Sequence, residues 1–354
     1  MRFAVGFYLI IWAFLSMVAV VQADGNRMSV SGEDILYNGK PIKLIGLRCS
    51  NALISDSTAD KLIDALDRYQ EYGLNTISVF LMGSRFGDVK GYLPDGSLSA
   101  VHVRRLERIL RATDEREMVA IVGCLYWSTS RAKEDLSYWN QEDADKAIGN
   151  TALWLNSKGF GHVVLDPDNE GMAVRAMKWQ VDSFIVAAKA AYPELIVANN
   201  TRQESTLEDL NMHFGPRKPG KPWLDSESTP KNAPISGYWS QYSKERHQED
   251  EAYTNYSRIG RYTEEMKQDQ FEKTRDYIEN LNGILLASTW IQCAPNEGVG
   301  GPFVEFGGLS DLGSSQNLGA AWNRDIDTLH PDAGILWWLE YVKKRYKGKT
   351  WTRR

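Results

Sequence analysis

The stretch Met118-Val-Ala-Ile-Val-Gly-Cys-Leu125 is a run of apolar and small residues with no charged residue inside it. A half-exposed strand alternates apolar and polar side chains. A strand of a parallel sheet that is covered on both faces is apolar throughout. We therefore expect residues 118–125 to form a buried strand of a parallel sheet.

Similar segments recur along the chain and alternate with segments of helical spacing. Leu62, Ile63, Leu66 and Tyr69, for example, follow the three- and four-residue spacing of an amphipathic helix. The strands are predicted at residues 44–48, 76–80, 118–125, 162–165, 195–198, 210–213, 223–226 and 283–290. The helices are predicted at residues 58–72, 101–112, 143–155, 172–191, 263–281 and 331–346, with a short helical turn at 204–209.

Eight strands in this alternation, in a chain of 354 residues, favour a closed (β/α)8 barrel over a doubly wound open sheet. Residues 29–41 precede the first strand and contain the turn dipeptide Asn38-Gly39, which predicts a small hairpin. We expect this hairpin to cover the bottom of the barrel, and we expect residues 24–354 to form a single α/β domain.

The N-terminus has the features of a signal peptide. Arg2 is followed by an apolar run over residues 3–20, and Val21 and Ala23 offer small residues at the −3 and −1 positions of a cleavage site. Cleavage after Ala23 predicts a secreted or periplasmic protein that has no membrane contact. An uncleaved membrane anchor is the alternative.

The composition excludes several function classes. The net charge is −5, which offers no basic surface for nucleic acid. The cysteines have no zinc-site spacing and no glycine pattern of a nucleotide site follows a strand, so we predict no metal and no cofactor. The chain has no Gly-x-Ser-x-Gly elbow, which gives no support for an esterase. The 12 Trp and 16 Tyr suit either a core or stacking on sugar rings. The oligomeric state is left open.

Cys49 and Cys293 follow the first and last predicted strands, which become neighbours when a barrel closes. This proximity makes a disulfide between them one hypothesis, and small buried thiols are the alternative.

In such a barrel the reactive groups lie at the C-terminal ends of the strands. Glu170 follows the fourth predicted strand and Glu227 the seventh. Two carboxyl groups facing each other across the mouth suit glycoside hydrolysis, in which one gives a proton and the other is ionised. The rival carboxylates are Glu204 and Asp225, and Glu170 could instead be a first-turn glutamate of the next helix.

Polar and aromatic side chains at other strand ends are candidate substrate contacts. Arg48, Arg85 or His213 beside one glutamate would keep it ionised. Tyr126 and Trp127 end the third strand. Asp166 and Asp168, which precede Glu170, suit helix capping and loop hydrogen bonds better than catalysis.

Four segments carry a resemblance to a known group. Val163-Val-Leu-Asp-Pro-Asp-Asn169-Glu170 resembles the strand-4 Asn-Glu motif of the clan A glycoside hydrolases, the cellulase-like group that includes family 5. Lys221-Pro222-Trp-Leu-Asp-Ser-Glu227 resembles the strand-7 motif of that group, and Ser288-Thr-Trp290 its strand-8 tryptophan. Tyr37-Asn-Gly-Lys-Pro-Ile-Lys-Leu-Ile-Gly46 is similar to its entry into strand 1.

The resemblance implies roles for these residues. Glu170 would be the acid/base and Glu227 the nucleophile, while Asn169 would bind the sugar 2-hydroxyl and Trp290 would floor the sugar site. His213 matches a strand-6 histidine of the group.

Two departures from the group stand out. Phe214-Gly215 follows His213 where the group often has a tyrosine two residues on, and Ser228-Thr229 follows Glu227 in place of Phe-Gly. The resemblance also implies an arginine that supports the nucleophile, a role that either Arg48 or Arg85 would fill.

The sequence thus predicts a retaining glycoside hydrolase whose partner is a poly- or oligosaccharide. The alternatives are a carbohydrate-binding barrel without catalysis and a metal-assisted hydrolase or lyase on the same fold.

Overall fold

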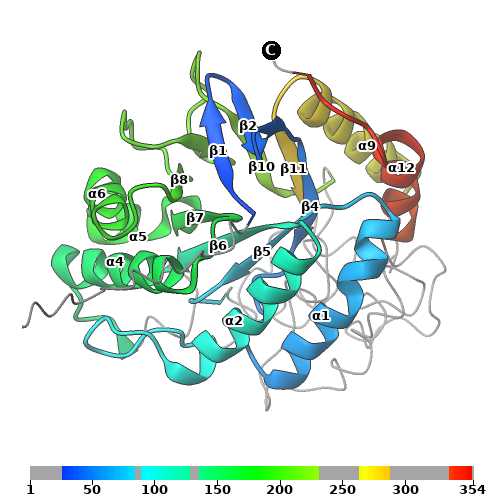
Figure 1. The fold of residues 1–354 in the computed structure, drawn as a ribbon. Helices are drawn as coiled ribbons and strands as arrows, with labels where there is room; N and C mark the ends of the chain where they lie inside the picture. Colours follow the sequence, from blue (N-terminus) through cyan, green and yellow to red (C-terminus); the bar gives the residue numbers. More distant parts are fainter. Residues whose placement is uncertain (1–25, 84–88, 128–134, 231–262, 288–334, 353–354) are drawn as a thin grey trace, which may run out of the picture.

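Eight parallel strands close into a barrel in the order β10-β11-β4-β5-β6-β7-β8-β9 (Figure 1). The computed structural model describes residues 26–83, 89–127, 135–230, 263–287 and 335–352. The closed barrel confirms the predicted fold and excludes the open sheet. Its strands are β4 (Leu44–Arg48), β5 (Thr76–Phe80), β6 (Val119–Leu125), β7 (Val163–Asp168), β8 (Ile196–Asn199), β9 (Leu210–Met212), β10 (Trp223–Ser228) and β11 (Gly283–Leu286).

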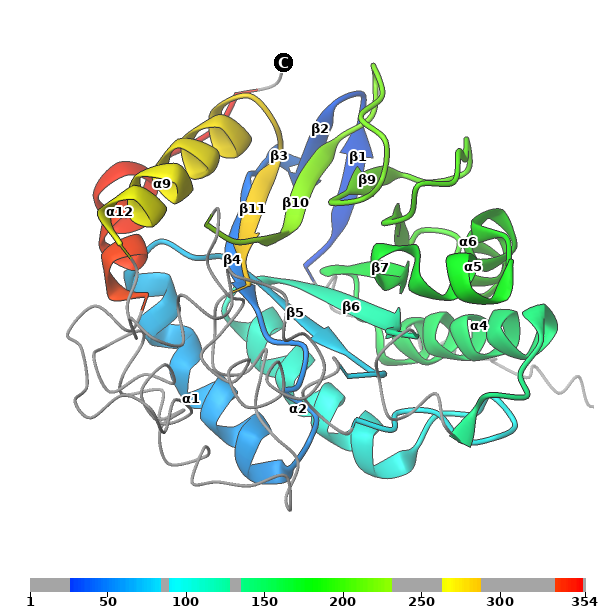
Figure 2. The ribbon, with the colours of Figure 1, turned by 180° about the vertical axis from the view of Figure 1, so that it is seen from behind.

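The helices lie around the outside of this barrel, as both views show (Figure 1 and Figure 2). Local sequence fixes several of their ends. The Ser55 hydroxyl accepts the Thr58 N–H at the start of α1, and Asn140 and Asp143 form a reciprocal capping box at the start of α4. The described helices are α1 (Asp56–Glu71), α2 (Ala100–Glu115), α4 (Gln141–Lys158), α5 (Met172–Met177), α6 (Val181–Ala191), α9 (Glu264–Glu279) and α12 (Leu336–Tyr346).

One predicted helix, over residues 172–191, is wrong as a single element. It is divided into α5 and α6 at Lys178, whose φ is 63°. The side chain of Gln203 replaces the lost helical hydrogen bonds, since its amide donates to the Trp179 carbonyl and its oxygen accepts the Val181 N–H. A contact from a distant segment therefore overrides the helical periodicity.

The links around β9 are short. The predicted helical turn at residues 204–209 is also wrong, because the described links from β8 to β9 and from β9 to β10 contain no helix. Loops alone connect these three strands.

The predicted N-terminal hairpin is confirmed as a three-stranded antiparallel sheet of β1 (Met28–Ser31), β2 (Asp34–Tyr37) and β3 (Lys40–Pro41). Asn38 and Gly39 have φ values of 49° and 75°, the left-handed pair that a tight hairpin turn requires. The Met28 N–H donates to the Gly161 carbonyl, just before β7, so the hairpin covers the N-terminal end of the barrel.

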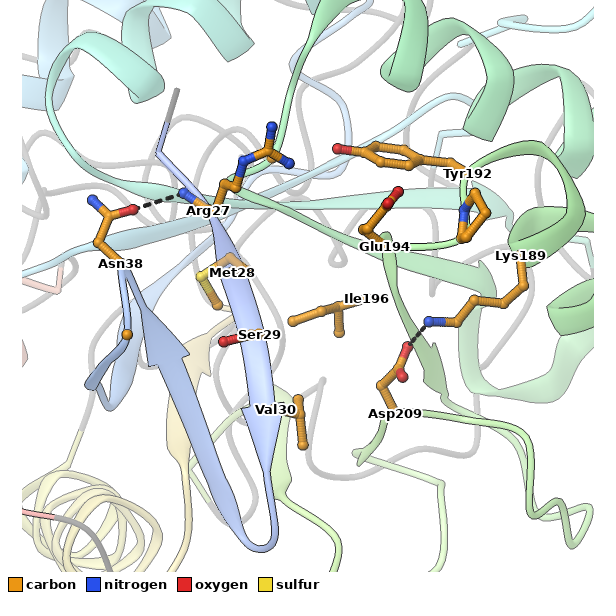
Figure 3. A pocket seen from close by; sticks show the side chains of 13 residues that line it. Arg27, Met28, Ser29, Val30, Asn38, Lys189, Tyr192, Glu194, Ile196 and Asp209 are labelled. Carbon is orange, nitrogen blue, oxygen red and sulfur yellow. Dashed lines mark hydrogen bonds and ion pairs between the residues drawn. The ribbon is translucent and has the colours of Figure 1, made fainter. Parts of the chain in front are cut away.

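A hollow of about 780 Å³ lies between β1 and the chain that enters β8 (Figure 3). Tyr192 and Ile196 line it, and an ion pair of Lys189 with Asp209 lies at its edge. It is at the N-terminal ends of the strands, opposite the end where a barrel of this kind carries its reactive groups.

Side chains that alternate along β6 belong to two cores. Val119 and Ile121 pack inside the barrel with the hairpin residues Ile35 and Tyr37. The other face of the strand packs against the helices in the larger outer core. The barrel is thus filled with apolar side chains at its bottom, which leaves its top for polar groups.

Two cysteines are buried thiols in this structure. Cys49 and Cys124 are both free. The hypothesis of a disulfide between Cys49 and Cys293 involves a residue, Cys293, that lies outside the described residues. The Cys49 side chain is packed in the outer core and is fully buried, which is the alternative that the sequence left open.

Within the described residues, no helix is both long and apolar enough to cross a bilayer. The predicted signal peptide, residues 1–23, falls outside them.

Gly123 provides a test of the packing at the top of β6. A Cβ at Gly123 would lie 2.0 Å from the Phe80 ring, so we expect Gly123→Ala to lower the free energy of unfolding by about 1–3 kcal/mol. Gly149, inside α4, has nothing closer than 3.6 Å to such a Cβ. Gly149→Ala should therefore raise the free energy of unfolding by about 0.5–1 kcal/mol. Denaturant titration measures both, and equal effects of the two variants would contradict the packing described.

Candidate active site

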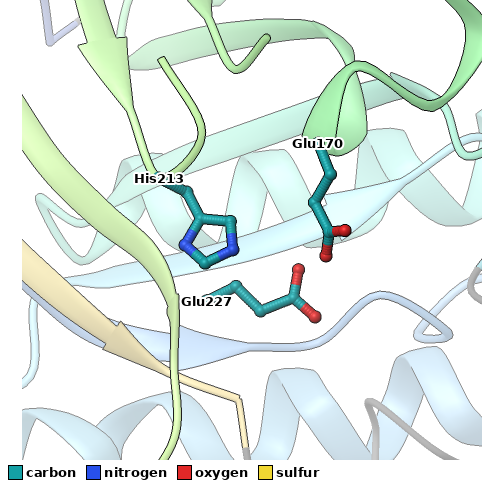
Figure 4. Close-up of side chains that lie close together, drawn as sticks. All are labelled: Glu170, His213 and Glu227. Atoms are coloured by element: carbon teal, nitrogen blue, oxygen red, sulfur yellow. The ribbon is translucent and has the colours of Figure 1, made fainter. Parts of the chain in front are cut away.

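The C-terminal ends of β7 and β10 bring Glu170 and Glu227 together (Figure 4). One carboxylate oxygen from each and a ring nitrogen of His213 lie within 4.8 Å of one another. Figure 4 shows the two carboxyl groups pointing toward each other. The structure thus places these three predicted site residues in one cluster.

The backbone at Glu170 turns its side chain into the barrel mouth. Glu170 and Gly171 both have left-handed φ values, 53° and 64°, in a short 3-10 segment before α5 begins at Met172. Glu170 is therefore not a first-turn glutamate of the following helix. A positive φ at a residue other than glycine costs free energy and is typical of functional positions.

Arg48, at the end of β4, forms a buried ion pair with Glu227. Its side chain is fully buried, and Nη2 lies 3.0 Å from Oε2 of Glu227. The same nitrogen donates to Oδ1 of Asn169 at 2.8 Å, and the guanidinium lies 4.6 Å from the centre of the Phe80 ring. Burial lowers the pKa of Arg48, but Glu227 and other negative neighbours outweigh it and raise the pKa. Of the two candidate arginines, Arg48 lies beside Glu227, and Arg85 lies outside the described residues.

The two carboxyl groups interact strongly with each other. Burial raises the pKa of Glu227 to about 8, and its interaction with Glu170 adds to this, while the Arg48 and His213 charges oppose it. Removal from water and a second negative charge beside it both disfavour the ionised form of Glu227. Because the Arg48 guanidinium cannot lose its charge, it favours the ionised form of Glu227 and opposes this rise.

His213 is fixed by a carboxylate that lies behind it. Nδ1 of His213 donates to Oδ1 of Asp225 at 2.8 Å, and the same oxygen accepts the Glu227 backbone N–H at 3.2 Å. Burial lowers the pKa of His213, but the hydrogen bond with Asp225 and the charges of Asp225, Glu227 and Glu170 raise it overall. Asp225 is therefore a partner of the histidine rather than a rival of Glu227.

A polar network positions Asn169. Its Oδ1 accepts from Arg48, and its Nδ2 is buried without a hydrogen-bond partner among the described residues. Asn200 donates to Asp166 at 2.9 Å from the same amide nitrogen that approaches Asn169. Burial raises the pKa of Asp166 to about 6 against the effects of Asn200 and Arg48. Asn169 thus has one free donor in the mouth of the barrel.

Asp168 caps α5, as the sequence predicted. Its carboxylate accepts the N–H groups of Ala173 and Val174, both at 2.9 Å. Burial raises the pKa of Asp168 to about 7, and these two hydrogen bonds oppose the rise.

The other residues predicted at the site do not all lie in the cluster of Glu170, His213 and Glu227. Tyr126 is 2% exposed and its ring lies near the Arg48 guanidinium, at 5.7 Å. Trp127 is 4% exposed and packs on Trp179 in the outer core, with 4.9 Å between the ring centroids. Trp290 lies outside the described residues. The rival Glu204 is 79% exposed and pairs with Lys218, apart from the cluster.

Sequence reasoning missed two supporting residues, Asn200 and Phe80, which contact Asp166 and Arg48, respectively. It named Asp225 as a rival carboxylate, whereas the structure pairs Asp225 with His213. No sequence signal indicates Phe80, an apolar residue in an apolar strand.

Glu170, His213 and Glu227 also form a set that could ligate a metal ion such as Zn²⁺. The fit is poor, because the Arg48 cation already occupies one side of Glu227 and because a raised pKa favours the protonated, non-ligating form of His213.

The fold and the site define a (β/α)8 barrel with paired carboxyls at its C-terminal mouth. The sequence matches no family model and no curated protein. Among solved structures, a variant of the glycoside hydrolase family 5 mannosidase from Rhizomucor miehei is similar with a TM-score of 0.53 and 12% identity, over 91% of this chain and 99% of that one. A family 5 glycoside hydrolase from Bacteroides vulgatus is similar with a TM-score of 0.53 and 11% identity, over 77% of this chain and 65% of that one. The predicted resemblance to the clan A barrels is therefore confirmed for the fold.

Proposed function

We propose that this chain is a glycoside hydrolase that cleaves O-glycosidic bonds in a poly- or oligosaccharide with retention of configuration. The observation that carries the proposal is the approach of the Glu170 and Glu227 carboxyl oxygens to within 4.8 Å. Carboxyls about 5–5.5 Å apart suit direct attack on the sugar, whereas about 6.5–9.5 Å leaves room for the water of an inverting enzyme. The predicted signal peptide supports a secreted or periplasmic enzyme.

In the first step, the Glu227 carboxylate attacks the anomeric carbon while Glu170 gives its proton to the leaving oxygen. The glycosidic C–O bond breaks and a glycosyl ester forms on Glu227. In the second step, the Glu170 carboxylate takes a proton from water, the resulting hydroxide attacks the same carbon, and the ester bond to Glu227 breaks. Both carboxyl groups return to their starting states.

The neighbouring residues fit this sequence of charges. Arg48 stabilises Glu227 as a carboxylate before attack and as the leaving group of the second step. The free Nδ2 donor of Asn169 suits the sugar 2-hydroxyl, whose hydrogen bond strengthens in the transition state. The structural relatives named as a mannosidase and a glycoside hydrolase have the same fold and support this class of reaction.

Substitution of the two glutamates tests the proposal. Glu170→Gln removes the acid and should lower kcat by about 10²- to 10⁴-fold, and Glu227→Gln removes the nucleophile and should lower it at least as much. Both variants should still bind the substrate, since glutamine has nearly the same shape as glutamate and Arg48 is retained. Hydrolysis rates on a broad glycan panel and calorimetric binding measure the two effects.

Glu204→Gln is the matched control, because it makes the same change at an exposed glutamate and should leave kcat unchanged. A chelator should not affect the parent enzyme. Loss of activity on chelation would support the metal-assisted alternative, and binding without any turnover by the parent would support the non-catalytic barrel.

The pH dependence follows from the raised pKa of Glu227. The pKa of Glu227 is raised to about 8, so the carboxylate that attacks the sugar is lost by protonation as the pH falls below that value. We therefore expect kcat/KM to rise as the pH rises toward about 8, well above the value of about 4.3 for an unperturbed glutamate. A pH profile from 4 to 10 measures this limb, and a rise centred between pH 4 and about 5 would contradict the raised pKa of Glu227.

A further inference from the structure

Two exposed arginines flank one aromatic ring beside the catalytic cluster. Phe214 follows His213 directly, and their rings meet edge to face with 4.8 Å between centroids. The Cζ atoms of Arg202 and Arg175 lie 4.9 Å and 5.7 Å from the centre of the Phe214 ring. Arg175 belongs to α5 and Arg202 to the link after β8, so three segments place two cations at one point.

Neither guanidinium has an ion-pair partner in the part of the chain that the structure describes. Other arginines on the surface pair with acids, as Arg116 does with Asp67 and Arg345 with Glu279. Arg175 affects the pKa of Asp168, but that carboxylate is 1% exposed and its oxygens accept two backbone N–H groups. Two neighbouring cations that repel each other, in a chain of net charge −5, thus keep their N–H edges available.

Hydrogen bonds connect Phe214, the ring that both arginines contact, to the site. The Phe214 N–H donates to Oδ1 of Asn200, whose amide group donates in turn to Asp166. The ring is therefore held by the same network that positions Asn169. The guanidiniums stack on Phe214 by cation–π attraction, which limits their motion while their planar edges remain open.

We infer that Arg175 and Arg202 bind an acidic group of the substrate, a carboxylate or a sulfate ester, and that the substrate is an anionic glycan. The planar guanidinium can donate two parallel hydrogen bonds to the oxygens of either oxyanion. A neutral sugar offers no negatively charged pair of acceptors. This inference rests on the proposed function, because it assigns the sugar class that the same site accepts.

Matched pairs of glycans test the inference. The pairs are β-1,4-mannan with polymannuronate, arabinoxylan with glucuronoxylan, and agarose with κ-carrageenan. The first two pairs probe a carboxylate and the third a sulfate. We expect the parent to prefer the acidic member of one pair. In the double variant Arg175→Gln/Arg202→Gln, the ratio of kcat/KM for the acidic over the neutral member should fall by about ten- to hundred-fold, mainly through KM.

Two controls separate binding from packing. Lysine at both positions keeps the positive charge without the planar guanidinium and should restore part of the preference for the acidic glycan. Thermal melting reports whether each variant is folded. Arg68→Gln removes an exposed arginine from α1 and should leave the preference unchanged.

Calorimetric binding of the same six glycans to the Glu227→Gln variant keeps the test independent of turnover. Binding of an acidic glycan that weakens when both arginines are replaced supports the inference, even if the parent cleaves nothing and the hydrolase proposal fails. A parent that cleaves or binds only neutral glycans, or a double variant that binds acidic glycans as tightly as the parent, would overturn the inference while the hydrolase proposal stands.

Discussion

The buried ion pair of Arg48 with Glu227 is the interaction on which the site depends. Arg48 leaves β4 and reaches Glu227 on β10 and Asn169 at the end of β7, so one side chain connects three strands across the mouth. Taking both charges out of water costs several kcal/mol each, and only close partners on every side offset that cost. Phe80 beneath the guanidinium and Asn169 beside it supply such partners. Removal of the Arg48 cation would leave the buried Glu227 carboxylate without this counter-charge.

The ion pair of Arg48 with Glu227 also explains why the two glutamates have different electrostatic surroundings. Their residue type and their position at strand ends are the same, but only Glu227 lies against a permanent cation. The left-handed backbone at Glu170 turns its carboxyl toward that of Glu227. The proposed acid and the proposed nucleophile thus differ in environment rather than in residue type, as in other carboxylate pairs.

Much of the fold could be predicted from the sequence, because its signals are local. Uniformly apolar strands indicate burial on both faces, and the Asn38-Gly39 dipeptide fixes a hairpin turn. The convergence of Glu170 and Glu227 followed from one geometric rule, since the C-terminal ends of parallel barrel strands meet at one mouth.

The parts that could not be predicted depend on contacts between distant segments. The break at Lys178 follows from hydrogen bonds with Gln203, and nothing near Lys178 in the sequence indicates it. The pairing of Asp225 with His213 depends on which side chains two adjacent strands turn to the same side. The two arginines at Phe214 come from separate segments, so their proximity has no local signature.

Direct attack of Glu227 on the sugar requires that no water stands between the two carboxyls. Proton NMR of the first product formed from a substrate of defined anomeric configuration distinguishes direct attack from attack by water. We expect this product to have the anomeric configuration of the substrate before mutarotation begins. A first product of inverted configuration would show that a water attacks the sugar and would exclude direct attack by Glu227.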